Sequence, residues 1–137
     1  MGKINVGKVI VGGLVAGVVM NFLDYIINAM ILKGTYDAAM AARNVDPASV
    51  NIATMVVLDF AMALLLVFTY AAIRPRFGAG PKTAIVAGLI LALTANVLAG
   101  YFVGMGYFTW NVWAPSAALS TINMCASALA GCALYKE

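Results

Sequence analysis

The dominant pattern in this sequence is four long runs of apolar residues, separated by short stretches that hold most of the charged side chains. An α-helix rises 1.5 Å per residue, so about 20 residues cross the hydrocarbon core of a bilayer. Each run has that length, and none alternates strictly as a barrel strand would. The pattern therefore predicts four transmembrane helices, at residues 6–32, 47–73, 83–103 and 115–135.

The predicted fold class is all-α, because backbone polar groups find no water in hydrocarbon and must be satisfied within each helix. The turn between the second and third runs is short, so those helices should be antiparallel neighbours. Composition agrees with a lipid environment, since 64% of the residues are apolar and only 9% are charged. We expect one transmembrane domain over residues 1–137, folded as an antiparallel four-helix transmembrane bundle.

Local chemistry marks the ends of the runs. Lys33-Gly34 is expected to stop the first helix. Asp46-Pro47 offers an N-cap and a first-turn proline to the second helix, and Pro115 opens the fourth. Pro75 and the stretch 78–81 are expected to break the chain between the second and third helices.

Two connecting segments are predicted to lie at the membrane surface. Residues 35–43 are expected to form one or two amphipathic turns with Thr35 as the cap. Residues 101–113 contain no charge and six aromatic side chains, which suits the level of the lipid headgroups.

Lys and Arg are distributed unequally between the two ends of the predicted bundle. Six lie on the side of the termini and two on the other: Lys3, Lys8, Arg74, Arg76, Lys82 and Lys136, against Lys33 and Arg43. Positive residues resist translocation, so we expect both termini to be cytoplasmic. Arg74, Arg76 and Lys82 share one turn and are candidates for lipid headgroup contact, although ordinary positive-inside anchoring is the favoured interpretation.

Every predicted helix carries a polar side chain that is expensive in lipid, about 2.5 to 3.5 kcal/mol for a central Asp. At 100° per residue these side chains fall on one face of each helix, and the faces lie at similar depth. In the first helix the same face continues into Gly13-x-x-x-Gly17, for which packing within the bundle is favoured over dimerisation. We predict one buried polar layer, formed by Asn21, Asp24, Asn28, Asp59, Asn96 and Asn123.

Three interpretations of this layer stay open. In the first interpretation the layer is structural. Amides and carboxyls form hydrogen bonds across helices and so fix the register of the helices. Asp24 and Asp59 have no Lys or Arg partner within the predicted helices, which is typical of a proton or cation site. An enzymatic acid and base pair is the third interpretation, but no nucleophile motif supports it.

Residue counts exclude several kinds of site. The chain has no His, which removes His-containing zinc, haem and copper sites and His-dependent catalysis. Cys125 and Cys132 are seven residues apart on one helix, about 10 Å, which is too far for a disulfide. The glycines lack phosphate-binding spacing, and the basic residues form no nucleic-acid face. We predict no metal, no cofactor and no nucleic acid partner.

The start at residues 12–19, the following Asn21 and Asp24, and the turn at residues 70–84 resemble a family of small uncharacterised four-helix bacterial inner-membrane proteins. The resemblance implies a bacterial inner membrane setting and no particular activity.

The resulting functional hypothesis is an accessory or stabilising component of a larger membrane assembly, without enzymatic activity. Its expected partners are the lipid bilayer and other membrane subunits or copies of the chain itself. The alternative is a small proton- or cation-coupled transporter that uses Asp24 and Asp59 as a homo-oligomer. A membrane enzyme acting on lipid at the aromatic face is the weakest hypothesis.

Overall fold

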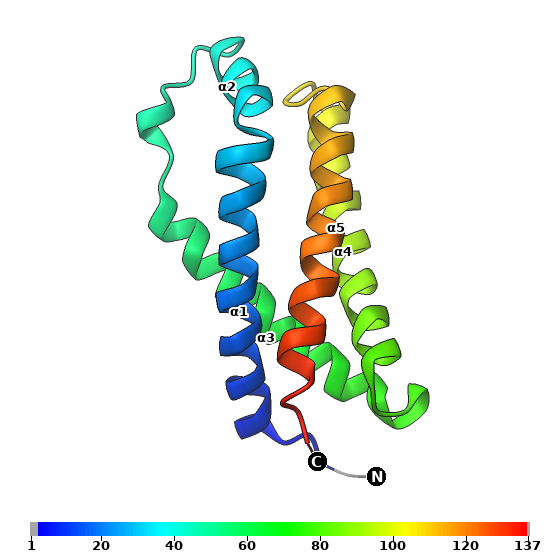
Figure 1. Ribbon diagram of the computed structural model, residues 1–137. Helices are drawn as coiled ribbons and strands as arrows, with labels where there is room; N and C mark the ends of the chain where they lie inside the picture. Colours follow the sequence, from blue (N-terminus) through cyan, green and yellow to red (C-terminus); the bar gives the residue numbers. More distant parts are fainter. Residues whose placement is uncertain (1–2, 137) are drawn as a thin grey trace.

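The computed structural model describes residues 3–136, and every regular element in that range is helical (Figure 1). A π-helical segment, η1 (Ile27–Ile31), continues the first helix, and a 3-10 turn, η2 (Pro47–Ser49), precedes the third. The predicted all-α class is therefore confirmed for the described residues. The α-helices are α1 (Val6–Ile26), α2 (Lys33–Ala41), α3 (Ile52–Phe77), α4 (Pro81–Gly104) and α5 (Trp110–Cys132).

Three segments of the described chain are long and apolar enough to cross a membrane. They are Val6–Ile31, Ile52–Phe77 and Pro81–Gly104. α5 has 23 residues but lies outside this set, because three serines, one threonine and two asparagines interrupt its apolar residues. Residues 3–136 thus contain three helices with the length and hydropathy of membrane spans.

α1, α4 and α5 run alongside one another, while α3 crosses them obliquely in the view of Figure 1. α3 packs against α1 over part of its length and reaches α4 and α5 near the end of the molecule that carries both termini. Asn5 at the start of α1 donates its backbone N–H to the hydroxyl of Tyr135 at 3.1 Å, which joins the two ends of the chain.

Small residues allow α1 to approach its neighbours closely. A Cβ added at Gly13 would lie 2.5 Å from the side chain of Leu64, and one at Gly17 would lie 2.2 Å from the ring of Phe60. Gly13-x-x-x-Gly17 therefore packs against α3, and the prediction that it serves the bundle is confirmed. Residues without solvent exposure surround these contacts: Ala16, Ala63, Leu66, Val67, Ala87 and Ala128.

The second apolar run forms a regular helix later than predicted. The Asp46 carboxylate accepts from the backbone N–H of Ala48 at 2.9 Å, but this cap supports only the 3-10 turn. α3 starts at Ile52, because Asn51 provides a second cap and accepts from the N–H of Thr54 at 3.0 Å.

Neither Pro75 nor Pro115 marks a helix boundary. Pro75 lies inside the last turn of α3, which continues to Phe77 and ends at Gly78, where φ is 83°. Pro115 lies inside α5, which begins five residues earlier at Trp110. Each proline removes one N–H donor and so costs its helix one backbone hydrogen bond, but neither proline ends the helix. The predicted surface loop at residues 101–113 shortens to residues 105–109.

The connection after the first helix is more helical than predicted. α1 passes into η1, the regular pattern breaks at Leu32, and α2 begins at Lys33. Thr35 is inside α2 and is not its cap. Lys33 and Asp37, four residues apart, form an ion pair that supports this short helix.

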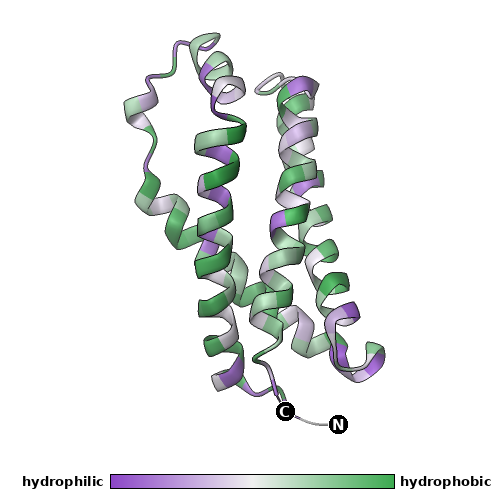
Figure 2. Ribbon diagram, in the orientation of Figure 1, coloured by the Kyte–Doolittle hydropathy of each residue, from purple (hydrophilic) through white to green (hydrophobic). Residues whose placement is uncertain are grey.

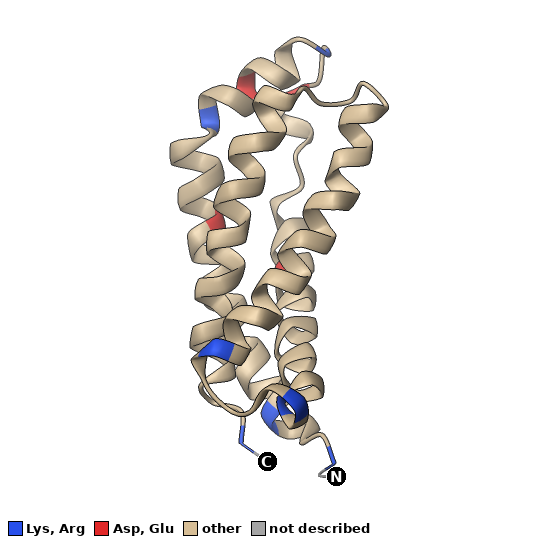
Figure 3. Cartoon of the chain, turned by 90° about the vertical axis from the view of Figure 1, so that its right-hand side faces the viewer, with Lys and Arg blue, Asp and Glu red and all other residues tan. Residues whose placement is uncertain are grey.

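Charge and hydropathy follow the long axis of the molecule. Figure 3 shows most of the Lys and Arg positions at the end that carries the termini, with two acidic positions about midway along the helices. Figure 2 shows that the long helices are mainly hydrophobic, with hydrophilic positions repeated along the upper half of α1. The predicted grouping of basic residues at one end is present in the fold.

Candidate functional site

Asp24 and Asp59 meet between α1 and α3. Both side chains line one pocket, although they are 35 positions apart in the sequence. Both residues are half-buried. The sequence predicted that these two acids share a polar layer, and the structure brings them together.

Asn123 of α5 joins the acid pair through Asp24. Its side-chain amide donates to Oδ1 of Asp24 at 2.7 Å and to the backbone carbonyl of Met20 at 3.1 Å. Asn123 is only 2% exposed, so both hydrogen bonds are buried inside the protein. The predicted contact of Asn123 with the layer is therefore present.

Ser127 fixes the orientation of Asn123. The Ser127 hydroxyl donates to Oδ1 of Asn123 at 3.0 Å, which occupies the amide oxygen and turns the NH₂ group toward Asp24. Ser127 has no solvent exposure. Sequence analysis did not include it among the site residues, although its position four residues after Asn123 on the same helix was the available signal.

A pocket of about 580 Å³ opens beside the acid pair. One side is formed by η1 and the half of α1 that lies away from the termini, and the other by the first turns of α3. Its polar lining consists of four side chains that sequence analysis singled out: Asn21, Asp24, Asn28 and Asp59. Its other walls are formed mainly by apolar side chains: Tyr25, Ala29, Val50, Ile52, Met55, Val56 and Leu58. No Lys or Arg is among these described lining residues.

The two asparagines of α1 differ in their hydrogen bonding. The amide of Asn21 donates to the carbonyl of Gly17 in its own helix at 2.9 Å, which leaves its Oδ1 as an acceptor. Asn28 is exposed in η1 and lines the outer part of the pocket. Together with the acids they bring several oxygen acceptors to the polar end of the pocket, and the asparagine amides also bring N–H donors.

The helices are tightly packed on the side of the pocket that faces the termini. Phe60 directly follows Asp59 and lies against Gly17, and Leu64 lies against Gly13 one turn further. Ala63 and Val67 are completely buried in the same region. The pocket is thus accessible from the far half of the molecule and closed toward the end with the termini.

Asn96 lies outside this site, which corrects the prediction of a single six-residue layer. Its amide donates to Oγ1 of Thr121 at 3.0 Å, and its Oδ1 accepts from the Ser120 hydroxyl at 3.1 Å. Trp113 donates its indole N–H to the Asn96 backbone carbonyl at 3.1 Å. α5 packs against both α1 and α4, so Asn123 and Ser120 serve two different interfaces. Polar groups at similar depth therefore form two clusters.

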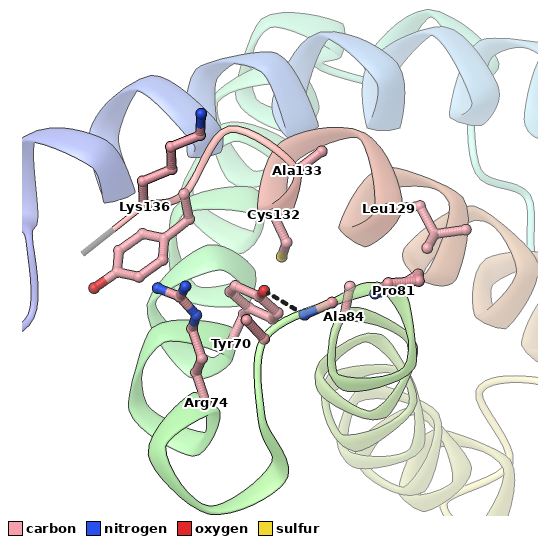
Figure 4. Close-up of a pocket in the computed structure, with 11 residues that line it drawn as sticks. Tyr70, Arg74, Pro81, Ala84, Leu129, Cys132, Ala133 and Lys136 are labelled. Carbon is pink, nitrogen blue, oxygen red and sulfur yellow. Dashed lines mark hydrogen bonds between the residues drawn. The ribbon is translucent and has the colours of Figure 1, made fainter.

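The three basic residues predicted to contact headgroups have different surroundings. Arg74 is half-buried, and its guanidinium lies over the Tyr135 ring, 5.5 Å from the centroid. It borders a smaller pocket of about 310 Å³, drawn in Figure 4, in which the Tyr70 hydroxyl accepts from the Gly80 N–H at 3.1 Å. Arg76 and Lys82 are exposed near the turn. Their contact with lipid headgroups stays a prediction.

The chemistry of the larger pocket is that of two carboxyl groups supported by amides. Among residues 3–136 no group of three His, Cys, Asp or Glu side chains is placed to hold a metal ion, and both cysteines are free thiols. Comparison with protein-family models, curated proteins and solved structures finds no match to this chain. The functional assignment therefore depends on the geometry of the pocket.

Proposed function

We propose that this chain is a small integral membrane protein that binds a proton or a small cation between Asp24 and Asp59 and carries it across the bilayer. The observation that supports this proposal is the meeting of two acids, from two apolar helices, in an open pocket whose lining contains no basic residue. An ionised Asp at the centre of a membrane helix costs about 2.5 to 3.5 kcal/mol. A bound proton or cation offsets that cost.

The position of the two carboxyl groups in one pocket supports the same proposal. An ionised carboxylate has only acceptor oxygens, so two of them repel each other and cannot form a hydrogen bond. A shared proton or a bridging cation turns this repulsion into an attraction. Asn123 stabilises one member of the pair by donating to Asp24 at 2.7 Å.

We propose α5 as the fourth membrane span of an antiparallel bundle. Its 23 residues extend about 34 Å at 1.5 Å per residue, enough to cross the hydrocarbon core. Its polar side chains lower its mean hydropathy, but Asn123 and Ser127 are buried against α1 and avoid lipid. Both termini would then lie in the cytoplasm, and the resemblance in sequence suggests a bacterial inner membrane.

Transport would require the pocket to reach the side of the termini, where Phe60 and Leu64 now close it. A homo-oligomer is the favoured arrangement, because the first turns of α3 are apolar and uncovered. Ile52 is 70% exposed and Leu58 is 61% exposed. A second copy on this surface would enclose the pocket and provide the other wall of a passage. The proposal includes no enzymatic activity.

Flux measurements with the purified protein in liposomes test the proposal. Asp24→Asn and Asp59→Asn should each abolish proton or cation flux without loss of folded yield. Asp37→Asn, which removes an acid in α2 that pairs with Lys33, should keep the flux. Absence of flux in the wild type, or a collapse of folded yield in either pocket variant, would contradict the transport role.

The second candidate is an accessory or stabilising component of a larger membrane assembly. The same uncovered half of α3 favours it, because a partner helix with a Lys or Arg at the right depth would satisfy the acid pair. Native mass spectrometry after gentle extraction separates the candidates. Other membrane subunits at fixed stoichiometry would support the accessory role, and a pure homo-oligomer would support the transporter.

A further inference from the structure

We propose that the pocket between α1 and α3 takes an organic primary ammonium ion with an apolar body. This inference rests on the proposed cation site and names the class of ligand that the site selects. Three features of the pocket carry it: the volume, the separation of polar and apolar walls, and a lining with two acids, no Lys or Arg and a single aromatic ring.

The pocket is much larger than a bare ion needs. A water molecule occupies about 30 Å³ in the liquid, and the pocket volume of about 580 Å³ is many times larger. A proton held between two carboxyl groups needs no cavity, and a sodium or potassium ion needs a small fraction of this one. The volume lies within the range typical of sites for organic molecules.

Polar and apolar groups occupy different parts of the pocket. The two acids and two asparagines come mainly from α1, whereas Val50, Ile52, Met55, Val56 and Leu58 come from α3 and the residues before it. Ile52, Met55 and Leu58 are each more than half exposed, so they can make dispersion contacts with an apolar ligand body. The arrangement matches a molecule with one charged end and one apolar end.

The polar end of the pocket is suited to a hydrogen-bond donor. The carboxyl oxygens and Oδ1 of Asn21 are acceptors, and one N–H of the Asn21 amide already donates to the Gly17 carbonyl. If the acids share one proton, the pair carries a single negative charge. A primary ammonium matches this site because it provides one positive charge and three N–H donors.

A quaternary ammonium is a poorer match. It has no N–H to donate, and proteins that bind such ions surround them with several aromatic faces. Tyr25 is the single aromatic side chain among the described lining residues. We therefore expect the pocket to prefer the primary amine over its trimethylated form.

Isothermal titration calorimetry of the purified protein in detergent, corrected with empty micelles, tests this preference. The probes are cyclohexylmethylamine, its N,N,N-trimethyl derivative and cyclohexylmethanol, which share one apolar body. The amine should bind saturably, and the trimethyl derivative should bind at least about tenfold more weakly, because it loses hydrogen bonds to charged acceptors. The alcohol should show no saturable binding.

Three variants locate the binding. Asp59→Asn should weaken amine binding by about tenfold or more, because it removes a charged acceptor. Val56→Trp should reduce binding by filling the pocket, and it leaves both acids in place. Asp37→Asn on α2 is the control and should bind as the wild type does. Gel filtration and thermal unfolding confirm that each variant is folded.

The outcomes separate this inference from the proposed function. Equal binding of the amine and its trimethyl form, or binding that Asp59→Asn and Val56→Trp both leave unchanged, would overturn the ligand class. If flux were still lost in the acid variants, the proposed cation site would stand. Amine binding that depends on Asp59 and Val56, in a protein without flux, would keep the ligand class and reject transport.

Discussion

Ser127 touches neither carboxyl group, yet it sets the direction in which Asn123 donates. Its hydroxyl occupies Oδ1 of Asn123, and the amide then reaches Asp24 and the Met20 carbonyl. Without that hydroxyl, a buried amide oxygen loses its partner in a region with no access to water. The hydrogen bonds of the site thus extend two residues beyond the pocket lining, to Asn123 and Ser127.

Ser127→Ala should lower the free energy of unfolding by about 1 to 2 kcal/mol, because it leaves a buried acceptor unsatisfied. Unfolding in mixed micelles measures the change. Thr94→Val is the control, since the Thr94 hydroxyl donates only to the Ile90 carbonyl in its own helix and the residue is exposed. It should change stability by less than about 0.5 kcal/mol. Similar losses in both variants would reject the role of Ser127.

The crossing of α1 and α5 depends on two glycines. A Cβ at Gly131 would lie 2.5 Å from the Gly12 carbonyl oxygen and 2.6 Å from the Cβ of Ala16, both closer than real contacts allow. These atoms belong to the helix body and cannot rotate away as a side-chain tip does. The two helices therefore have to separate to admit even one methyl group.

Gly131→Ala should destabilise the protein by about 1 to 3 kcal/mol through overpacking at this crossing. Gly104→Ala is the matched control, because a Cβ there meets no heavy atom within 4 Å and Gly104 also lies in a helix. That variant should be neutral or more stable by up to about 1 kcal/mol, as expected from helix propensity. Thermal unfolding of both variants measures the contrast, and equal behaviour would contradict the close crossing.

For the helices, the length of the apolar runs predicted the long elements well, but the prolines predicted their ends poorly. Pro47 begins only a 3-10 turn because Asn51 caps α3 four residues later. Pro75 and Pro115 lie within helices, which continue although each proline removes one backbone hydrogen bond. A proline pattern alone does not show which of two nearby caps the chain uses.

In the folded molecule the start of α1 and the turn between α3 and α4 lie at one end, together with most of the Lys and Arg (Figure 3). The loop between α2 and α3 lies in the other half of the molecule. Positive residues resist translocation, so this asymmetry predicts the orientation of the bundle in the membrane.

Cysteine labelling of intact cells measures that orientation. In a background with Cys125→Ala and Cys132→Ala, a membrane-impermeant maleimide should label Ala48→Cys, in the exposed turn before α3, directly. It should label Ala79→Cys, between α3 and α4, only after the membrane is permeabilised. The reverse pattern would show the opposite orientation, and labelling of both positions in intact cells would contradict a spanning bundle.

The sequence by itself determined that the chain is helical, that its long helices suit lipid, and that Asp24, Asp59 and Asn123 face the interior, because helical periodicity and the cost of burying charge act on local residues. Tertiary structure alone decided that Asn96 belongs to a separate cluster with Ser120 and Thr121, and that the acids border an open pocket. Both depend on how helices distant in sequence rotate and tilt against one another. The close contacts of glycines with neighbouring helices set that geometry, which cannot be predicted from the sequence of one apolar run alone.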